Sequence, residues 1–163
     1  MKNSWLLPDL TATERLGQAL ERGCPWGERE PRVLYLSGEL GAGKTTLAAA
    51  LLRELGVAEP VRSPSYALVE PYQVGERCVV HIDLYRLEGR SELEQLGLRD
   101  YLNGQTLLLI EWPERGAGAL PACDLALTLD TRPTRRASVS ARTEAGNMWL
   151  KLVSRAVPNE DES

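Results

Sequence analysis

The 163-residue chain lacks any apolar run that approaches the roughly 18 residues needed to span a bilayer. Its first residues, MKNSWLLPDL, also lack the long apolar core and the small-residue cleavage site of a signal peptide. We therefore expect a cytoplasmic protein that makes no membrane contact. The length fits one domain, expected over residues 1–155, and the polar end of the chain predicts a disordered tail over residues 156–163.

Cysteines are few, since the chain has only three of them, far apart and without CxxC spacing. This pattern suggests neither a disulfide framework nor a zinc site. Cys24, Cys78 and Cys123 are therefore expected to be buried free thiols.

An excess of basic residues is also missing, because the formal net charge is -4. Binding of DNA or RNA depends mainly on phosphate neutralisation by Lys and Arg, so this charge argues against DNA binding and against direct capture of RNA. The one local arginine cluster, Arg132, Arg135 and Arg136, is expected to be a solvated face rather than a binding patch.

Two stretches have the Ser/Thr-x-x-Glu form of a helix capping box. The first begins at Thr11 and predicts a helix that stops at Gly23, and the second begins at Ser91 and predicts a short helix that stops at Gly97. A third helix is expected before Gly56, where leucines recur every four residues on one stripe.

Several runs are typical of strands. The compact apolar runs at residues 32–37 and 106–110 suit strands that are buried on both faces of a sheet. Residues 66–72 and 78–85 predict a β-hairpin around the turn sequence QVGE. An antiparallel meander is expected in the C-terminal third, over residues 124–130, 137–141 and 148–153.

Positions 38–45 read GELGAGKT, which fits the phosphate-binding pattern G-x-x-x-x-G-K-[ST] at every fixed position. The expected strand before it and helix after it are the surroundings in which backbone N–H groups cradle phosphates. A simple turn would not need Lys followed by Thr. We predict that Lys44 contacts the β and γ oxygens of a nucleotide and that Thr45 binds Mg²⁺. Thr46 either touches the α-phosphate or lies on the helix surface.

Two carboxylates could complete such a site. Glu111 ends an apolar run, where a parallel strand would deliver it to the edge at which nucleotides bind, although it could instead cap a loop. Asp83 lies in VVHIDLYRL, where alternation places it on one face with His81, although it could instead pair with Arg86. His81 is the only histidine and is either a structural residue or a functional one.

Five segments occur in one order along the chain: GELGAGKTT, RSPSYALVEPY, HIDLYRL, SELEQLGLRDYL and IEWPERG. Together they resemble the bacterial TsaE (YjeE) family, the P-loop ATPases of tRNA threonylcarbamoyladenosine (t6A) biosynthesis. The resemblance spans residues 8–153. It implies an α/β fold, a P-loop NTPase-like three-layer sandwich with a mixed parallel and antiparallel central sheet.

The same resemblance implies ATP or ADP and Mg²⁺ as cofactors, with Thr45 and Glu111 at the metal and Lys44, Asp83 and Glu111 in catalysis. It implies nucleotide contacts along and beside the loop, at Leu10, Thr13, Glu39, Leu40, Gly41, Ala42, Gly43, Lys44, Thr45, Thr46, Trp112 and Arg135. Residues 11–13 also have the capping explanation, and Arg136 matches the family arginine as closely as Arg135 does.

One position departs from the family pattern, which usually has threonine in S-P-T-[FY], whereas this chain has Ser65. The hydroxyl is kept and a methyl group is lost. Contact with metal or water through the oxygen should survive, while the packing of this loop would be looser.

By resemblance, the protein is an ATPase that acts with the TsaB–TsaD transferase heterodimer in t6A formation and meets tRNA only indirectly. No residue resembles a trans-acting arginine finger, so turnover by the isolated protein is expected to be slow. A kinase, which would need an acceptor pocket and usually an arginine-rich lid, and a non-catalytic ATP-dependent binding module are the alternatives.

Overall fold

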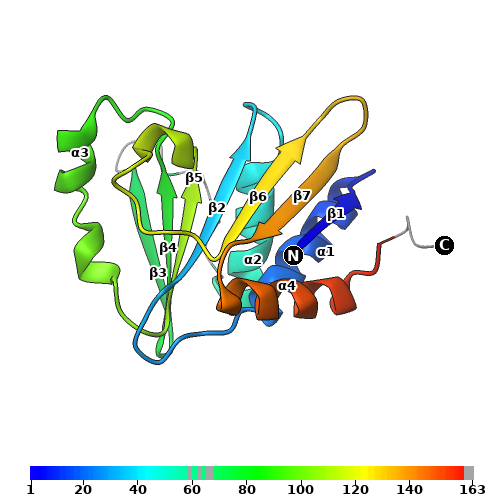
Figure 1. Cartoon of the computed structure of the whole chain (residues 1–163), viewed down its shortest axis with the longest axis horizontal. Coiled ribbons are helices and arrows are strands. Elements are labelled where there is room, and N and C mark those ends of the chain that lie inside the picture. Colours follow the sequence, from blue (N-terminus) through cyan, green and yellow to red (C-terminus); the bar gives the residue numbers. More distant parts are fainter. Residues whose placement is uncertain (59, 62–63, 65–67, 160–163) are drawn as a thin grey trace.

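A seven-stranded mixed sheet forms the centre of the described part of the chain (Figure 1). The structure is a computed structural model that describes residues 1–58, 60–61, 64 and 68–159. Along the sheet the strands have the order β1-β7-β6-β2-β5-β4-β3. Their bounds are β1 Lys2–Leu6, β2 Arg32–Gly38, β3 Val69–Val74, β4 Arg77–Asp83, β5 Thr106–Glu111, β6 Leu125–Asp130 and β7 Arg136–Ala141.

The four central strands, β6, β2, β5 and β4, run parallel, and antiparallel strands complete both sides of the sheet. In β5, Leu107 and Leu109 belong to one apolar core, and Leu108 and Ile110 belong to a second core on the other face. A central strand can be apolar at every position because helices and loops cover both of its faces. The predicted α/β sandwich with a mixed sheet is therefore confirmed.

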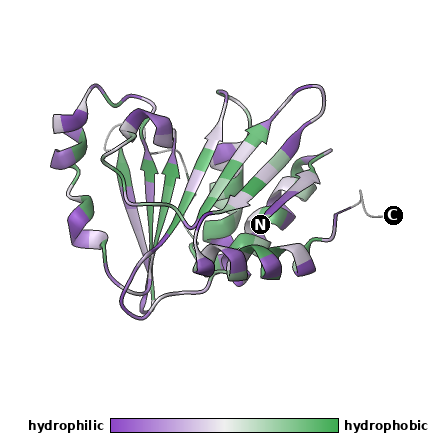
Figure 2. Ribbon diagram, viewed as in Figure 1, coloured by the Kyte–Doolittle hydropathy of each residue, from purple (hydrophilic) through white to green (hydrophobic). Residues whose placement is uncertain are grey.

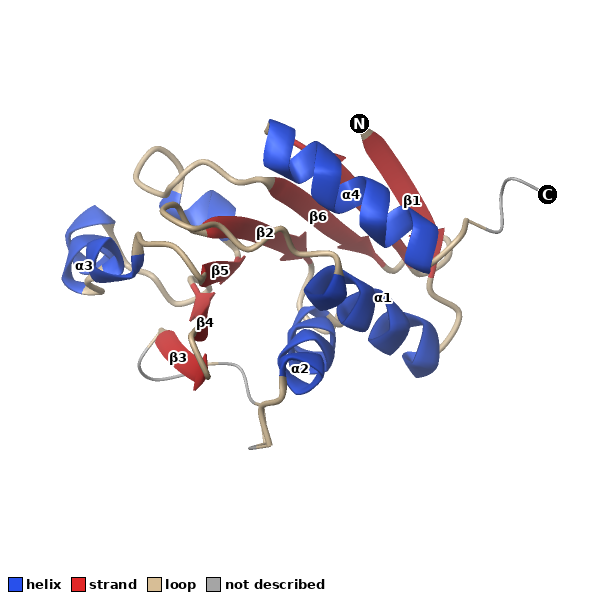
Figure 3. Ribbon diagram, turned by 90° about the horizontal axis from the view of Figure 1, so that it is seen from below, coloured by secondary structure: helices blue, strands red, loops and turns tan. Residues whose placement is uncertain are grey.

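Helices cover the two faces unequally. The helices α1 (Leu10–Arg22) and α2 (Lys44–Leu55) pack side by side on one face (Figure 3), where a Cβ on Gly17 would come within 2.7 Å of the Ala50 Cβ. The other core lies under α3 (Arg90–Gln95), and its neighbours include the short 3-10 helices η1 (Leu98–Tyr101) and η2 (Pro113–Gly116). Figure 2 shows the apolar residues concentrated along the sheet and hydrophilic ones on the outer surfaces.

Several local predictions are confirmed. β2 and β5 occupy the two predicted apolar runs, and α2 stops at Gly56, which caps it with a left-handed backbone. β3 and β4 form the predicted hairpin, whose turn contains Gly75 at φ 59°. The beginning of the first hairpin run, residues 66–67, lies outside the described residues. All three cysteines are free, with Cys24 and Cys123 buried and Cys78 half-buried.

Both capping-box predictions name the wrong cap, although helices are present. Asp9 caps α1, because its Oδ1 accepts the Ala12 N–H at 2.8 Å, and Thr11 lies inside the first turn. Gly89 precedes α3 without a side-chain cap, and Ser91 lies within that helix. An aspartate two residues upstream therefore serves the function that the sequence pattern assigned to a threonine.

The predicted meander is wrong in its last member, because residues 148–153 belong to a helix, α4 (Glu144–Ala156). Thr143 caps it by accepting the Gly146 N–H at 2.9 Å, and Trp149, Leu150 and Val153 form its buried side. Gly146 in the first turn of α4 is needed for close approach, since a Cβ there would lie 2.1 Å from the Asp124 carbonyl oxygen.

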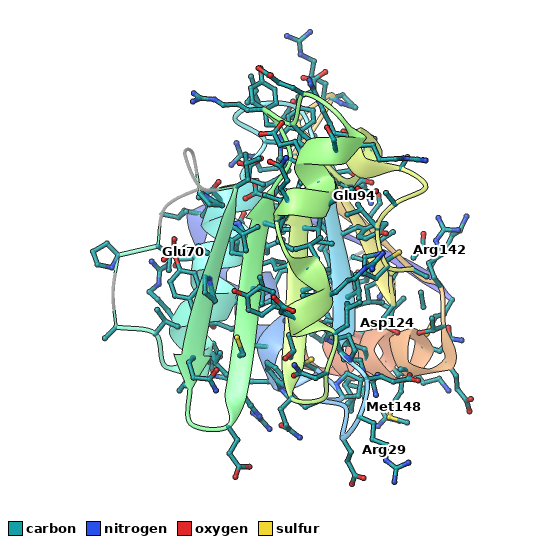
Figure 4. All side chains as sticks on the ribbon, turned by 90° about the vertical axis from the view of Figure 1, so that its left-hand side faces the viewer. Arg29, Glu70, Glu94, Asp124, Arg142 and Met148 are labelled. Atoms are coloured by element: carbon teal, nitrogen blue, oxygen red, sulfur yellow. The ribbon has the colours of Figure 1, made fainter. Side chains whose placement is uncertain are left out.

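Asp124 connects this helix to the sheet and lies beside α4 in Figure 4. Its carboxylate accepts the Val33 N–H at 2.8 Å and the Thr143 hydroxyl at 2.6 Å. β1, at the opposite side of the sheet from β3, was not predicted, because its sequence KNSWL has no apolar alternation. No helix in the described ranges is both long and apolar enough to cross a membrane.

Replacement of Gly146 by alanine tests the close approach. At an ordinary position inside a helix, replacing glycine by alanine would stabilise the helix by about 1 kcal/mol. Here the clash with the Asp124 carbonyl should dominate, as overpacking typically costs about 1–3 kcal/mol. We expect Gly146→Ala to lower the free energy of unfolding in urea, whereas Gly89→Ala, where a Cβ meets nothing within 4 Å, should change it little. A stabilised Gly146→Ala protein would contradict this packing.

The cap of α1 gives a second test. Asp9→Ala should reduce the free energy of unfolding by about 1 kcal/mol, because the Ala12 N–H loses its acceptor. Thr11→Ala is the matched control and should change stability by less than about 0.5 kcal/mol. Equal losses for both variants, measured by chemical denaturation, would show that the cap is assigned wrongly.

Candidate functional site

The ends of three neighbouring parallel strands meet at one edge of the sheet. β2 ends at Gly38, β4 at Asp83 and β5 at Glu111, and Asp83 and Glu111 are direct register partners. A cleft of about 320 Å³ lies there, lined by Leu40, Gly41, Gly43, Lys44, Thr45, Thr46, Asp83, Tyr85, Glu111 and Trp112. A larger groove of about 740 Å³ beside α1 contains no comparable set of groups. The chemistry therefore points to the cleft at the strand ends.

The loop between β2 and α2 has the backbone that its glycines predict. Gly43, which precedes α2, has φ 106°, a backbone conformation that residues with a Cβ rarely adopt. Gly38 has φ 145°, and a Cβ there would lie 2.7 Å from the Leu129 carbonyl oxygen. The loop thus leads closely into the N-terminus of α2. Free backbone N–H groups and the helix dipole there favour the binding of an anion.

Lys44 lies at the centre of this arrangement. Its side chain is buried, with only 5% of the residue exposed, and its Nζ lies over the Trp112 ring, 4.4 Å from the ring centre. Nζ donates hydrogen bonds to the carbonyl oxygens of Gly38 at 2.5 Å and Glu39 at 2.9 Å. The ammonium group is therefore held inside the loop.

Burial lowers the pKa of Lys44 below its ordinary value, while the carboxylates of Glu111, Asp83 and Glu114 act in the opposite direction. The lysine thus loses water and gains negative neighbours. A phosphate in the cleft would meet a cation that is poorly hydrated, which strengthens their attraction.

Glu111 is almost fully buried at the end of β5, with 2% of the residue exposed. Its Oε2 lies 2.6 Å from Nε2 of His81, which is 0% exposed on β4. His81, predicted as either a structural or a functional residue, thus contacts a residue that lines the cleft, and its function stays a prediction. The Nδ1 of His81 has no hydrogen-bond partner among the residues that the structure describes.

Asp83 lies at the half-buried end of β4, on the same edge. The predicted alternation is confirmed, because Val80 and Ile82 belong to the core of the opposite face, as does Leu84 just after the strand. The Oδ1 of Asp83 accepts the Tyr85 N–H at 3.0 Å, which turns the chain around the carboxylate.

Two aromatic side chains, Trp112 and Tyr85, form part of the cleft lining. Trp112 follows β5 with a left-handed backbone, φ 57° and ψ 50°, and its N–H donates to the Leu36 carbonyl at 3.1 Å. The Tyr85 ring lies 5.0 Å from Trp112, and the Arg115 guanidinium stacks over Tyr85 at 5.2 Å. The sequence reasoning missed Tyr85 and Arg115. The alternation that places Tyr85 beyond Asp83 was the available signal.

The oxygen donors in the cleft fit Mg²⁺. Thr45 offers a hydroxyl, and Asp83 and Glu111 offer carboxylates. No group of three or more His, Cys, Asp or Glu that could hold a metal occurs within the described ranges. Mg²⁺ usually takes only one or two protein carboxylates, together with waters and phosphate oxygens, so this small set suits it better than a metal that needs a full protein cage.

Five residues predicted at the nucleotide do not line this cleft: Leu10, Thr13, Glu39, Ala42 and Arg135. Leu10 begins α1 and is 58% exposed, and Thr13 is buried on the same helix. Arg135 has an exposed side chain, and its carbonyl accepts the Leu7 N–H at 2.9 Å. This places Arg135 beside the segment that joins β1 to α1, whereas the neighbouring Arg136 donates to Ser4 at 2.9 Å.

A smaller pocket of about 240 Å³ lies between the loop and the end of β6. It is lined by Gly38, Glu39, Leu129, Asp130, Thr131 and Arg132. Of the other loop residues, Leu40 is exposed and Ala42 is buried. Ser65 lies outside the described residues.

Comparison with known proteins adds sequence evidence. The model of the TsaE family, described as threonylcarbamoyl adenosine biosynthesis protein TsaE, matches residues 7–138. The chain is 44% identical to the tRNA threonylcarbamoyladenosine biosynthesis protein TsaE of Haemophilus influenzae over 123 residues, which cover 75% of this chain and 78% of that one. The protein of the same name from Synechocystis is 40% identical over 115 residues, with 68% and 70% covered.

A solved structure gives the same fold. The crystal structure of YdiB from Bacillus subtilis superposes with a TM-score of 0.73 over 95% of each chain, at 23% sequence identity. Among the quoted segments, GELGAGKTT, HIDLYRL and IEWPERG provide the groups that meet in the cleft. Because the family match extends over most of its length, the chain belongs to the TsaE family.

Proposed function

We propose that this protein binds ATP with Mg²⁺ in the cleft at the strand ends and hydrolyses it to ADP. The observation that carries the proposal is the convergence of Lys44, Thr45, Asp83 and Glu111 in one cleft beside a glycine loop. These groups come from the start of one helix and the ends of two strands. A loop that served only as a turn would not need them to meet.

The chain's own groups divide the work of phosphoryl transfer. Backbone N–H groups of the loop and the ammonium group of Lys44 hold the β- and γ-phosphates and balance their charge. Thr45 and Glu111 would hold Mg²⁺, which would neutralise the charge that develops on the phosphates. Asp83 would orient the attacking water. Trp112 packs against Lys44 and limits the access of other water.

We propose further that the activity serves t6A formation together with the TsaB–TsaD transferase heterodimer. Support comes from the relatives, which are named as t6A biosynthesis proteins at 32–44% identity. The net charge of -4 favours a protein partner over direct tRNA binding.

Slow turnover by the isolated protein is part of the proposal. No arginine is among the residues that line the cleft in the described part of the chain. Arg115 stacks on Tyr85 but does not itself line the cleft. Arginine fingers are worth about 10³–10⁵ in rate where they are supplied. We therefore expect partner proteins to stimulate hydrolysis.

Phosphate release, measured with and without the transferase heterodimer, tests the function. Wild-type protein should release phosphate slowly alone and faster with the heterodimer. Asp83→Asn and Glu111→Gln should each reduce stimulated turnover by about 100-fold or more, because each removes a charge that organises water or metal. Glu76→Gln is the matched control, since Glu76 is exposed in the turn between β3 and β4 and does not line the cleft.

The other outcomes separate the alternatives. Transfer of the γ-phosphate to a small acceptor, in place of release, would show a kinase. ATP binding without turnover under any of these conditions would show a binding module.

A further inference from the structure

His81 and Glu111 make a polar contact between two buried side chains, which the packing of the fold alone does not require. His81 lies on β4 opposite Leu109, and Glu111 lies two residues further along β5, so the two side chains share one face of the sheet. Both are buried, at 0% and 2% exposure, and Nε2 lies 2.6 Å from Oε2. A short polar contact in such dry surroundings is stronger than the same contact at a surface.

The other ring nitrogen of His81 indicates which tautomer is present. Nδ1 is buried and has no hydrogen-bond partner among the described residues. A proton on Nδ1 would be a buried donor without an acceptor, which is costly. A proton on Nε2 is accepted by the Glu111 carboxylate instead. The geometry therefore favours an imidazole that donates from Nε2.

This donor fixes one oxygen of a flexible side chain. Glu111 has three rotatable side-chain bonds and lines the cleft. Because His81 on β4 holds Oε2 of Glu111 on β5, the paired strands also fix the direction of the remaining lone pairs of the carboxylate. Groups that hold a metal-binding side chain from behind in this way are usually worth about 10- to 100-fold in metal affinity or activity.

We propose that His81 is a positioning residue that donates a hydrogen bond to Glu111 and so presents its carboxylate to the Mg²⁺ that accompanies ATP. The inference rests on the proposed function. It assigns a function to the only histidine of the chain. His81 itself contacts neither nucleotide nor metal.

Two amide variants separate positioning from packing. In His81→Gln the side-chain amide nitrogen can occupy the place of Nε2 and still donate to Glu111. In His81→Asn the amide nitrogen corresponds to Nδ1 and cannot reach the carboxylate. Both variants put a neutral amide into the same buried position, so a loss that depends only on packing would affect both.

The main measurement is ATP binding to the full chain, measured by calorimetry at a series of Mg²⁺ concentrations. His81→Asn should require about 10- to 100-fold more Mg²⁺ for half-maximal binding, and His81→Gln should stay within about threefold of wild type. Wild-type behaviour in both variants, or equal losses in both, would overturn the inference. Circular dichroism checks that each variant is folded.

A second readout needs neither nucleotide nor substitution. Because the chain has one histidine, ¹⁵N-histidine labelling gives the signals of His81 alone. We expect the spectrum of the tautomer that carries its proton on Nε2. A proton on Nδ1 alone would contradict the inference, even if the variants failed to fold. Failure of wild-type protein to bind ATP with Mg²⁺ would instead remove the proposed function, and the inference with it.

Discussion

The parallel pairing of β4 with β5 is the constraint on which the site depends. It makes Asp83 and Glu111 register partners at the edge where β2 delivers the glycine loop. A shift of one residue would turn either carboxylate to the other face of the sheet, into apolar surroundings. Because both faces of β5 are apolar cores, such a shift would bury a carboxylate without a polar partner, and this cost fixes the position of the acids.

Charges in this cleft are held by a few short contacts inside a dry environment. Lys44 is bound by two loop carbonyls and covered by Trp112, and Glu111 is bound by His81. Each contact fixes a side chain before any ligand arrives. Preorganised charge of this kind makes the largest single contribution to the rate enhancement of many enzymes. The left-handed backbone of Trp112 is a local strain that the strand before it and the 3-10 helix η2 after it maintain.

Local sequence signals predicted the parts of this structure that local physics decides. The glycine loop, the apolar strands at residues 32–37 and 106–110 and the stop of α2 at Gly56 each follow from a few adjacent residues. The errors at α4 and β1 have distant causes. Gly146 is required by a carbonyl 22 residues earlier in sequence, that of Asp124, and β1 is held by β7 from the far end of the chain.

The site shows the same division. Lys44, Thr45, Asp83 and Glu111 could be selected from motifs, because their spacing within strands and loops is local. The contact between His81 and Glu111 spans 30 residues and depends on strand register, and the stacking of Tyr85, Trp112 and Arg115 depends on where two loops meet. Neither could be read from spacing. Family resemblance placed Leu10, Thr13 and Arg135 at the nucleotide, and those positions stay predictions.

Calorimetric titration of the full chain with ATP, in the presence of Mg²⁺ and again with the metal chelated, tests the central claim most directly. The loop, Lys44 and the acids at the strand ends predict saturable binding that depends on Mg²⁺ and is lost in Lys44→Ala. Wild-type protein that is folded by circular dichroism and still takes up no ATP in the presence of Mg²⁺ would contradict it.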